Sequence, residues 1–580
     1  MRSYVADFET TTNKENCHVW GWAMCEVEDL NNVYIGTNID SFFQLCEDFV
    51  DNVKVYFHNL KFDGQFIISW LFENGFKHVS EPKDRASNTF TTMISDKGLY
   101  YCIEVIFYLK GKKVKKVTFW DSLKVIPLSV EEIADTFQMP FKKLKIDYAA
   151  HNDLPYDSPM TDEEKAYLIN DVKIVASALA FFHSQGLNKM TIGGCALNEY
   201  MNMIGKNEFK RWFPIPQYHD DVKQSYRGGF TYLNPKFKEK TVGKGVVLDV
   251  NSMFPFVMKT KLLPFGTPVF YKGQYMKDDI YPLYTQMIKC QFELKKGKIP
   301  MIQIKKSLYY SGNEYLTSSN DEIVPLCLNS VDLELFLENY EVYNLEYVSG
   351  WKFKATTGLF NEYIEKWNNI KIQAKKDKNW GLYLIAKLYL NSLYGKFGTG
   401  NENKSKIPYV DNEGVIHYKD ADPEAKDSVY IPIASFITSY ARDIIVRAAQ
   451  QITDDYNAGK SKLQFIYCDT DSLHILSPDF SLPEGLYINQ TELGAFKFES
   501  KFRKGKFLRQ KCYIEDSTED IENDKPEYNL KITVAGMPLA CHEDVTFNNF
   551  KIGAVYKGKK QPQIVKGGVI LKDIDFTIQK

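Results

Sequence analysis

Residues 463–476, LQFIYCDTDSLHIL, contain two apolar segments around a short acidic turn. Aromatic and β-branched side chains favour strands on both sides of the turn, so we predict a hairpin. Its tip carries Asp469 and Asp471, with one residue between them. The hairpin therefore brings two carboxylates to one edge of the sheet that it joins.

A third carboxylate, Asp249, closes a strand predicted at residues 246–248 and leads into NSMFP at 251–255. Acids at strand ends can meet on one sheet although they are remote in sequence. Such a group suits in-line phosphoryl transfer, in which metal ions bridge a triphosphate and the attacking 3′-hydroxyl. We therefore predict a phosphoryl-transfer site where Asp249, Asp469 and Asp471 meet.

Cationic and aromatic residues follow a helical pattern between the two acidic segments. Residues 359–396 have helical periodicity that breaks near 376–381, which predicts two antiparallel helices in a projecting arm. On the second helix Lys387, Asn391 and Tyr394 share one face, so a cation for phosphate, a polar group and a ring for base stacking converge. In a later strand Lys511 and Tyr513 share a face in the same way.

A second set of acids lies near the N-terminus. Asp7 and Glu9 are two apart in a predicted strand, Asp63 follows another strand, and Tyr167 and Asp171 are four apart on a helix. Four carboxylates and a phenol can hold two Mg²⁺ or Mn²⁺ ions, which activate a water and stabilise the leaving oxygen in phosphodiester hydrolysis. Each acid alone is more often a surface residue, but the ordered combination is specific.

Composition sets limits on the class of protein. The 580 residues imply roughly three to five compact units, each able to bury a core. Lys plus Arg (72) and Asp plus Glu (74) give a net charge of −2, so a uniformly basic nucleic-acid coat protein is excluded. A polyanion must therefore meet local basic patches, and residues 110–116 and 501–511 supply two.

The sequence also predicts where the chain works. No apolar stretch reaches the ~18 residues needed to span a bilayer, and the acids at positions 7 and 9 interrupt a signal-peptide core. We expect a soluble cytoplasmic protein, in the host cytoplasm if it is viral, that makes no membrane contact. The ten scattered cysteines predict reduced thiols and no structural metal.

Taken in order, these motifs resemble the family B DNA polymerases, and more closely their protein-primed replicative type. The N-terminal acids resemble the DnaQ-like 3′–5′ exonuclease fold. The resemblance runs almost from end to end and rests on five segments: DFETT at 7–11, FHNLKFDG at 57–64, YRGGF at 226–230, KATTGLF at 354–360 and YCDTDS at 467–472.

The resemblance implies an α+β multidomain chain with a DnaQ-like (RNase H-like) α/β exonuclease domain and a right-hand polymerase with two family-specific insertions. It implies these boundaries: exonuclease 1–187, palm 188–259 and 428–535, first insertion 260–358, fingers 359–397, second insertion 398–427 and thumb 536–580. The first insertion would contact the terminal protein and DNA. The second would encircle DNA and support strand displacement and processivity.

Residue roles follow from the resemblance position by position. In the exonuclease site Asp7, Glu9, Asp63 and Asp171 would hold two Mg²⁺ or Mn²⁺ ions, assisted by Tyr167 and Lys143. Asn59, Phe62, Ser122 and Leu123 would grip the single-stranded end. In the polymerase site Asp249 and Asp471 would hold two further ions beside Asp469. Lys371, Lys387, Asn391 and Tyr394 would bind the nucleotide, Lys511 and Tyr513 the primer, and Tyr226, Gly228 and Gly229 the template.

One position departs from the family pattern. The family commonly has Tyr where this chain has Phe254, the ring on which the deoxyribose would rest. A phenyl face still excludes a 2′-hydroxyl by its bulk, so we expect sugar discrimination to survive.

The implied function is a DNA-directed DNA polymerase with 3′–5′ proofreading, which replicates a linear phage-type genome by protein priming and processive strand displacement. Its implied partners are primer and template DNA, dNTPs and a terminal protein, and we expect a monomer. Three alternatives remain: an RNA- or DNA-primed family B polymerase, an exonuclease with a non-polymerising DNA-binding C-terminal half, and a DNA clamp on an inactive polymerase fold. The intact second set of acids disfavours the last two.

Overall fold

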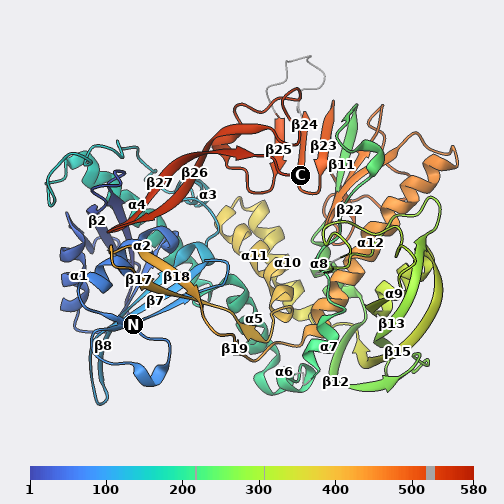
Figure 1. Cartoon of the computed structure of the whole chain (residues 1–580), viewed down its shortest axis with the longest axis horizontal. Coiled ribbons are helices and arrows are strands. Elements are labelled where there is room, and N and C mark those ends of the chain that lie inside the picture. The colour runs from blue at the N-terminus through green and yellow to red at the C-terminus, as the bar shows by residue number, and fades with distance from the viewer. Residues whose placement is uncertain (216–217, 306, 308, 517–529) are drawn as a thin grey trace.

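The computed structural model of the chain describes residues 1–215, 218–305, 307, 309–516 and 530–580. Figure 1 shows an N-terminal α/β lobe on one side and a larger mixed lobe on the other, with the helical pair α10 and α11 between them. The architecture is the α+β multidomain arrangement predicted from the sequence.

The N-terminal lobe is built on an eight-stranded sheet of order β3-β2-β1-β4-β8-β7-β6-β5. Its centre is parallel, because β1 pairs with β4 and β4 with β8 in the same direction. Its strands are β1 (Ser3–Thr10), β2 (Val19–Glu26), β3 (Val33–Gly36), β4 (Val53–Phe57), β5 (Lys77–His78), β6 (Thr89–Ile94), β7 (Tyr100–Lys110) and β8 (Lys113–Asp121).

Helices cover this sheet: α1 (Ile39–Asp48), α2 (Leu60–Glu73), α3 (Val130–Thr136) and α4 (Asp162–Ser184). Thr161 and Glu164 form a reciprocal capping box that starts α4, as its sequence predicts. By length and composition alone α4 could cross a membrane, but 56% of that stretch is buried inside the protein. It packs on β1 and β2 as a core helix of the lobe.

The larger lobe is centred on a five-stranded antiparallel sheet of order β22-β11-β21-β20-β9. The 27-residue helix α12 (Ile431–Asn457) packs on it, and a second sheet of order β10-β23-β24-β25 adjoins it. The strands are β9 (Thr231–Leu233), β10 (Thr241–Val242), β11 (Gly245–Val250), β20 (Gln464–Asp469), β21 (Ser472–Leu476), β22 (Phe496–Phe502), β23 (Gly505–Arg509), β24 (Cys512–Asp516) and β25 (Leu530–Val534).

The alternating residues 229–233 predict a strand, and β9 covers the last three of them. Gly229 and Phe230 belong to the loop before it. The acidic composition of residues 515–527 predicts an exposed loop, which is wrong for Glu515 and Asp516, because both are buried in β24. Their side chains point to opposite faces of the strand, and that of Glu515 meets a histidine. Residues 517–527 lie outside the described residues.

A four-stranded sheet of order β12-β15-β13-β14 projects from the large lobe, with α9 (Ser330–Asn339) packed on it. Its strands are β12 (Leu263–Lys272), β13 (Leu283–Leu294), β14 (Val324–Asn329) and β15 (Tyr340–Thr356). The remaining helices are α5 (Ile192–Ile204), α6 (Lys206–Trp212), α7 (His219–Lys223), α8 (Met253–Thr260), α10 (Asn361–Lys376) and α11 (Trp380–Phe397). The break between α10 and α11 falls where the sequence predicts it.

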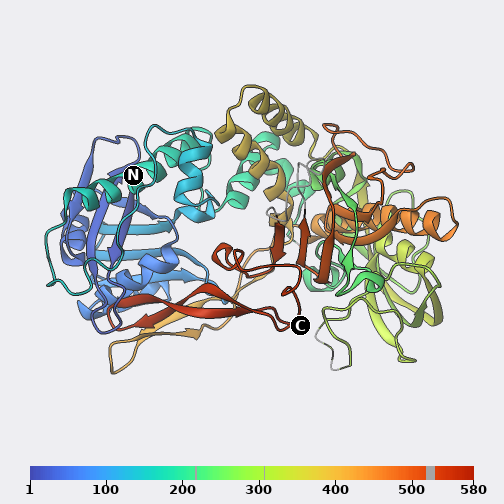
Figure 2. The ribbon, with the colours of Figure 1, turned by 90° about the horizontal axis from the view of Figure 1, so that it is seen from above.

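Two long hairpins connect the lobes. One contains β17 (Lys406–Val410) and β18 (Ile416–Asp420) above a base formed by β16 (Glu402–Asn403) and β19 (Glu424–Ala425). The other pairs β26 (Val555–Val565) with β27 (Gly568–Thr577). Both reach the N-terminal lobe, where Ile416 and Val569 join its core, and Figure 2 shows them running beside each other. Their tips touch, since a Cβ at Gly414 would lie 3.5 Å from Lys566.

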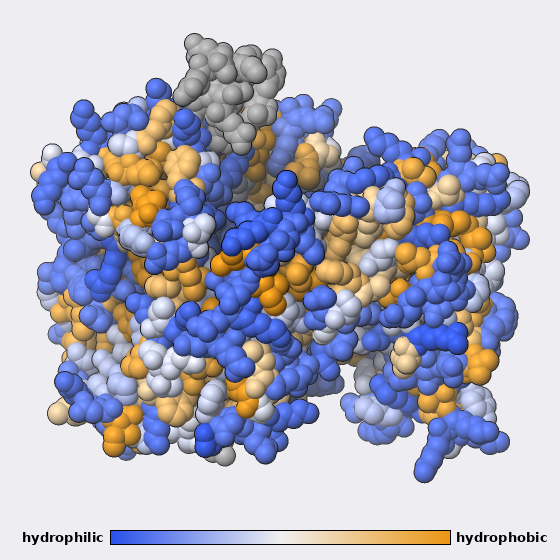
Figure 3. Space-filling view, turned by 180° about the vertical axis from the view of Figure 1, so that it is seen from behind, coloured by the Kyte–Doolittle hydropathy of each residue, from blue (hydrophilic) through white to orange (hydrophobic). Residues whose placement is uncertain are grey.

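Seen from behind, hydrophobic residues form separate patches among hydrophilic ones (Figure 3). A continuous core cluster extends from Val5 in the N-terminal sheet to Ile437 in α12, so the two lobes share packed side chains. All ten cysteines lie in the described segments, where each is a free thiol.

Candidate active sites

The N-terminal carboxylate site lies on one face of the eight-stranded sheet, between the inner strand β1 and the helices α2 and α4. Asp7 and Glu9 project from the same side of β1, Asp63 lies in the first turn of α2, and Tyr167 and Asp171 lie one helical turn apart on α4. All five line one cavity of about 950 Å³. The structure thus brings together residues that span more than 160 positions of sequence, as their pattern predicts.

The four carboxylates of this site repel one another in a buried setting. Burial, together with the charge of Asp171, raises the pKa of Asp7 to about 7. Burial and the charges of Asp7 and Asp171 raise the pKa of Glu9 to about 9, and burial also raises the pKa values of Asp63 and Asp171. The protein therefore gathers more negative charge here than it neutralises, which is a property of sites that receive cations.

One lysine partly compensates this charge, and two phenol groups lie beside it. Lys143 Nζ lies 2.5 Å from Asp171 Oδ2. Burial alone would lower the pKa of Lys143, but its contacts with Asp171 raise it. Tyr148 and Tyr167 are joined by a hydrogen bond of 3.2 Å between their hydroxyls. The sequence motifs did not include Tyr148, which follows no strand or helix periodicity, so only the structure reveals it.

The donors of this site suit a hard divalent cation. All four acids offer oxygen, and Asp171 Oδ1 is buried with no hydrogen-bond partner among the residues that the structure describes. Among the described residues, no three or more His, Cys, Asp and Glu side chains are arranged as a group that could hold a metal ion as they stand. At Asp171, Lys143 occupies one carboxylate oxygen.

The four residues expected to hold a single strand divide into two pairs. Asn59 and Phe62 line the cavity, and Asn59 adopts the left-handed conformation (φ 79°) that starts α2. Ser122 is fully buried, where its hydroxyl donates to the Phe57 carbonyl, and neither it nor Leu123 lines the cavity. The role predicted for this second pair stays a prediction.

The central carboxylate site lies at one end of the five-stranded sheet. Strand pairing sets Asp249 of β11 and Asp469 of β20 on either side of Ser472 in β21. Thr470, at the hairpin tip, has a positive φ of 60°, and its N–H donates to the Phe230 carbonyl. This tight turn places Asp471 beside the other two acids, and all three line a cavity of about 460 Å³.

Two lysines pair with these acids. Lys497 Nζ lies 2.7 Å from Asp249 Oδ2, and Lys511 Nζ lies 3.0 Å from both carboxylate oxygens of Asp469. Sequence reasoning named Lys511 but missed Lys497. The alternation of residues 496–500, FKFES, carries the signal that was overlooked, because it predicts a strand with Lys497 on its polar face.

Among the described residues no lysine forms an ion pair with Asp471, and its pKa is raised. Burial, followed by the charge of Asp249, raises the pKa of Asp471 to about 7. Burial also raises the pKa of Asp249, although Lys497 opposes this. The all-oxygen donor set and the excess of negative charge fit a divalent cation between Asp249 and Asp471.

A second cavity, of about 450 Å³, opens beside these acids toward α10 and α11. The rings of Phe254 and Tyr394 stack within it, with centroids 4.1 Å apart. Nearby cations crowd Lys371, whose pKa is lowered by burial and then by Lys497 and Lys387. The five residues predicted to hold a nucleotide all line this cavity: Phe254, Lys371, Lys387, Asn391 and Tyr394.

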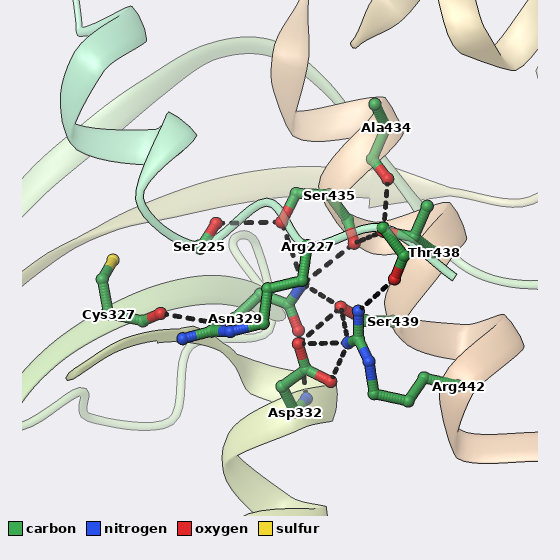
Figure 4. Close-up of polar contacts among 11 residues, drawn as sticks. Ser225, Arg227, Cys327, Asn329, Asp332, Ala434, Ser435, Thr438, Ser439 and Arg442 are labelled. Atoms are coloured by element: carbon green, nitrogen blue, oxygen red, sulfur yellow. Dashed lines mark hydrogen bonds and ion pairs between the residues drawn. The ribbon is translucent and has the colours of Figure 1, made fainter. Parts of the chain in front are cut away.

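The loop before β9 is held by a buried arginine of α12. Arg442 of α12 donates to the Gly228 carbonyl (2.9 Å) and forms a buried ion pair with Asp332 of α9 (2.5 Å). Figure 4 shows these two residues with Ser439 and Asn329 in one network. Sequence reasoning missed both charged residues, because a buried arginine and aspartate more than a hundred positions apart leave no local signal.

Gly229 of the same loop packs against the acidic hairpin. A Cβ at this position would lie 2.5 Å from Thr470 Oγ1, so only glycine lets the loop approach. The loop predicted to contact template is therefore in direct contact with the turn that carries Asp469 and Asp471. Tyr226 lies at the other end of this loop, where a Cβ at Gly398 would meet its hydroxyl at 2.7 Å.

Separate folds that each carry an oxygen-rich site, with cationic helices facing the central one, are the arrangement of a type B DNA polymerase. The model of the family described as DNA polymerase type B, organellar and viral, matches residues 49–159 and 155–481, and the chain belongs to this family. Relatives that align over the full length of the chain identify the type of polymerase within this family. The chain is 42% identical to the DNA polymerase of Bacillus phage phi29, over 100% of its length and 99% of that protein.

A second relative and a solved structure point to the same type of polymerase. The DNA polymerase of Streptococcus phage Cp-1 is 33% identical over 100% of this chain and 98% of that protein. A solved structure of phi29 DNA polymerase with primer-template DNA and incoming nucleotides superposes with a TM-score of 0.92 and covers 100% of both chains. The chain is thus a DNA polymerase of the phi29 type, which confirms the predicted family and fold class.

Proposed function

We propose that this polymerase also proofreads with a 3′–5′ exonuclease, starts synthesis on a terminal protein and displaces the strand ahead of it. One observation carries the two-activity part of this proposal: two carboxylate sites line separate cavities of about 950 and 460 Å³ on different sheets. The domain boundaries expected from the sequence, with palm, fingers, thumb and two insertions, are part of the proposal.

In synthesis, Asp249 and Asp471 would hold two Mg²⁺ or Mn²⁺ ions. When bound, the ions supply charge neutralisation for the triphosphate and a lowered pKa for the attacking 3′-hydroxyl. Lys371 and Lys387 bind and orient the phosphates from the helical pair. Asn391 and Tyr394 line the base pocket, while Lys511 and Tyr513 hold the primer end near Asp469.

In proofreading, Asp7, Glu9, Asp63 and Asp171 would hold the second pair of ions, which supply an activated water. Asn59 and Phe62 orient the last nucleotide in the cavity. Lys143 pairs with Asp171, and the hydroxyl of Tyr167, which lines the same cavity, would hold the attacking water. Ser122 and Leu123 would act from outside the cavity.

Protein priming is supported by likeness to the phi29 and Cp-1 enzymes and by the two insertions, which match the four-stranded sheet and the hairpin β17–β18. The solved phi29 complexes contain primer-template DNA and nucleotides, and we propose the same partners here, together with a terminal protein. The enzyme would act as a monomer in the cytoplasm of the host cell. An RNA- or DNA-primed polymerase is the alternative.

Primer extension on a singly primed circle in Mg²⁺ tests this function. With no strand ahead of the primer, we expect extension to the full circle. With continued synthesis, which demands displacement, we expect products longer than the circle. Products that stop at one circle length would contradict strand displacement, and dependence on an oligonucleotide even with terminal protein present would favour the alternative.

The Phe254 ring should select the sugar. Because Phe254 stacks on Tyr394 and lines the pocket, replacing it with valine removes the ring surface that would meet a 2′-hydroxyl. We expect Phe254→Val to raise ribonucleotide incorporation by about 30- to 150-fold, since a steric barrier of about 2 to 3 kcal/mol is lost. Phe254→Tyr is the control and should retain the preference for dNTPs. Single-nucleotide incorporation of rCTP against dCTP measures both variants.

Gly229 should tolerate no side chain. The Cβ of Gly229→Ala would overlap Thr470 Oγ1 and displace either the loop or the acidic turn. We expect nucleotide addition to fall about tenfold or more, in line with the 1 to 3 kcal/mol that overpacking costs. Degradation of single-stranded DNA, whose site lies in the other lobe, should stay near normal. Gly243→Ala, which meets open space, is the matched control.

A further inference from the structure

A buried His–Glu pair joins the two sheets of the large lobe behind the central carboxylate site. His474 of β21 and Glu515 of β24 are both at most 1% exposed, and His474 Nδ1 lies 2.6 Å from Glu515 Oε1. The carboxylate accepts, so Nδ1 carries the proton. The pair is the link between the strand that follows the catalytic turn and the strand that follows Lys511.

This pair is a poor source of stability. Glu515 Oε2 is buried with no hydrogen-bond partner among the described residues. Removing a carboxylate from water costs several kcal/mol, which a single hydrogen bond does not fully offset, and apolar residues of similar shape are often as stable. The presence of this pair is therefore better explained by the side chains that it holds in position.

His474 is fixed inside an aromatic cluster. Its ring lies edge-on to Tyr467 at 5.3 Å, to Phe507 at 5.7 Å and to Tyr513 at 5.0 Å between centroids. A ring in such contact with three others sets their positions, because packed side chains have little free space to move. The bond from Glu515 fixes the rotation of the imidazole and so fixes the faces that it presents to Tyr467 and Tyr513.

Tyr467 connects the aromatic cluster to Lys511, the proposed primer-binding lysine. Its hydroxyl accepts the backbone N–H of Lys511 (2.9 Å) and lies 3.3 Å from Asp469 Oδ2. Lys511 needs this support, since its φ of 53° is a conformation that non-glycine residues adopt only at a cost. In this conformation its ammonium meets both oxygens of Asp469.

We propose that the His474–Glu515 pair is a positioning device for the primer terminus, which acts through Tyr467 to hold Lys511 against the catalytic edge. This inference rests on the proposed role of Lys511 in binding the primer. The pair touches no substrate itself. Its loss should weaken primer binding and leave the chemical step nearly unchanged.

The test measures KM for primer-template and kcat for single-nucleotide addition in Mg²⁺. We expect Glu515→Ala to raise KM about tenfold, the value of one hydrogen bond of about 1.4 kcal/mol, with kcat within about twofold. Glu515→Gln keeps an oxygen acceptor for Nδ1–H and should restore a KM near that of the unmodified enzyme. An unchanged KM in a folded Glu515→Ala variant would overturn the proposal.

A second variant serves if Glu515→Ala does not fold. His474→Phe with Glu515→Leu replaces the pair by apolar side chains, so it should keep the melting temperature while KM rises. A normal KM in this stable double variant would equally overturn the proposal. Glu164→Ala is the matched control, because Glu164 pairs with buried His151 at 3.1 Å in the other lobe. It should lower the melting temperature and leave KM for primer-template unchanged.

Lys511→Ala separates this inference from the function on which it rests. If Lys511→Ala leaves KM unchanged, the role of Lys511 in primer binding is wrong. If it raises KM while the Glu515 variants do not, only the positioning role is wrong. We expect Glu515→Ala to add no further increase in KM to Lys511→Ala, because both changes remove the same contact.

Discussion

Asp249→Ala or Asp471→Ala abolishes nucleotide addition, with an expected loss of at least about a thousandfold, and leaves the degradation of single-stranded DNA largely intact. The acids lie together at one end of the five-stranded sheet, and burial with the charge of Asp249 raises the pKa of Asp471 to about 7. Removing either carboxylate removes a ligand for the cation that this excess charge attracts. Single-nucleotide extension of a labelled primer measures the loss.

The reverse pattern is expected when Asp7 and Asp63 are both replaced by alanine. Both acids line the cavity of the N-terminal lobe, and the two lobes keep their carboxylates on separate sheets. Degradation of a labelled single strand should disappear while extension of a matched primer stays normal. Melting temperatures confirm that each variant is folded. If a folded single-site variant lost both activities, the assignment of one activity to each site would fail.

Motifs that depend on strand or helix period could be predicted from the sequence. Asp7 and Glu9 share a face because strands have a period of two, and Tyr167 and Asp171 share one because helices have a period near 3.6. The acidic hairpin at Asp469 and Asp471 forms as its apolar flanks predict. In each case one local rule fixes both the element and the direction of its side chains.

Contacts that arise from packing between elements distant in sequence could not be predicted. Glu515 belongs to an acidic stretch, and local composition favours an exposed loop, yet strand pairing buries it against His474. The Arg442–Asp332 ion pair likewise depends on how α12 and α9 pack. Such contacts are set by tertiary structure, which overrides local propensity and leaves no periodic trace.

The hairpin β17–β18 stands apart from both carboxylate sites but is firmly docked. Tyr418 donates to Gln65 Oε1 and Gln65 Nε2 donates to Tyr100, both at 2.7 Å, and the Tyr100 and Tyr418 hydroxyls also hydrogen-bond to each other. Ile416 of this hairpin is buried in the N-terminal core, and Gly414 lies against Lys566 of the other hairpin. The two hairpins together therefore form a continuous connection between the lobes. Such a connection would enclose DNA and admit only a single template strand.

Deleting residues 402–425 should therefore spare chemistry and remove processive strand displacement. The ends are already adjacent, since the Lys426 N–H donates to the Asn401 carbonyl at 2.9 Å, so a short Gly/Ser bridge can join them. We expect single-nucleotide addition near normal and a fall of at least about tenfold in product length on a template that demands displacement, because an enzyme that no longer encloses DNA dissociates between additions.

Product length is to be measured with a trap that captures dissociated enzyme, so that each product reports one binding event. Tyr418→Phe is the graded control: it keeps the ring but loses the hydroxyl that bonds to Gln65 and Tyr100, so the hairpin stays in place less firmly anchored. Its products should be intermediate in length. If the hairpin only stabilised the fold, both variants would melt at a lower temperature, but their product lengths would not differ in this order. Long displaced products from the deletion variant would show that another part of the chain holds the DNA.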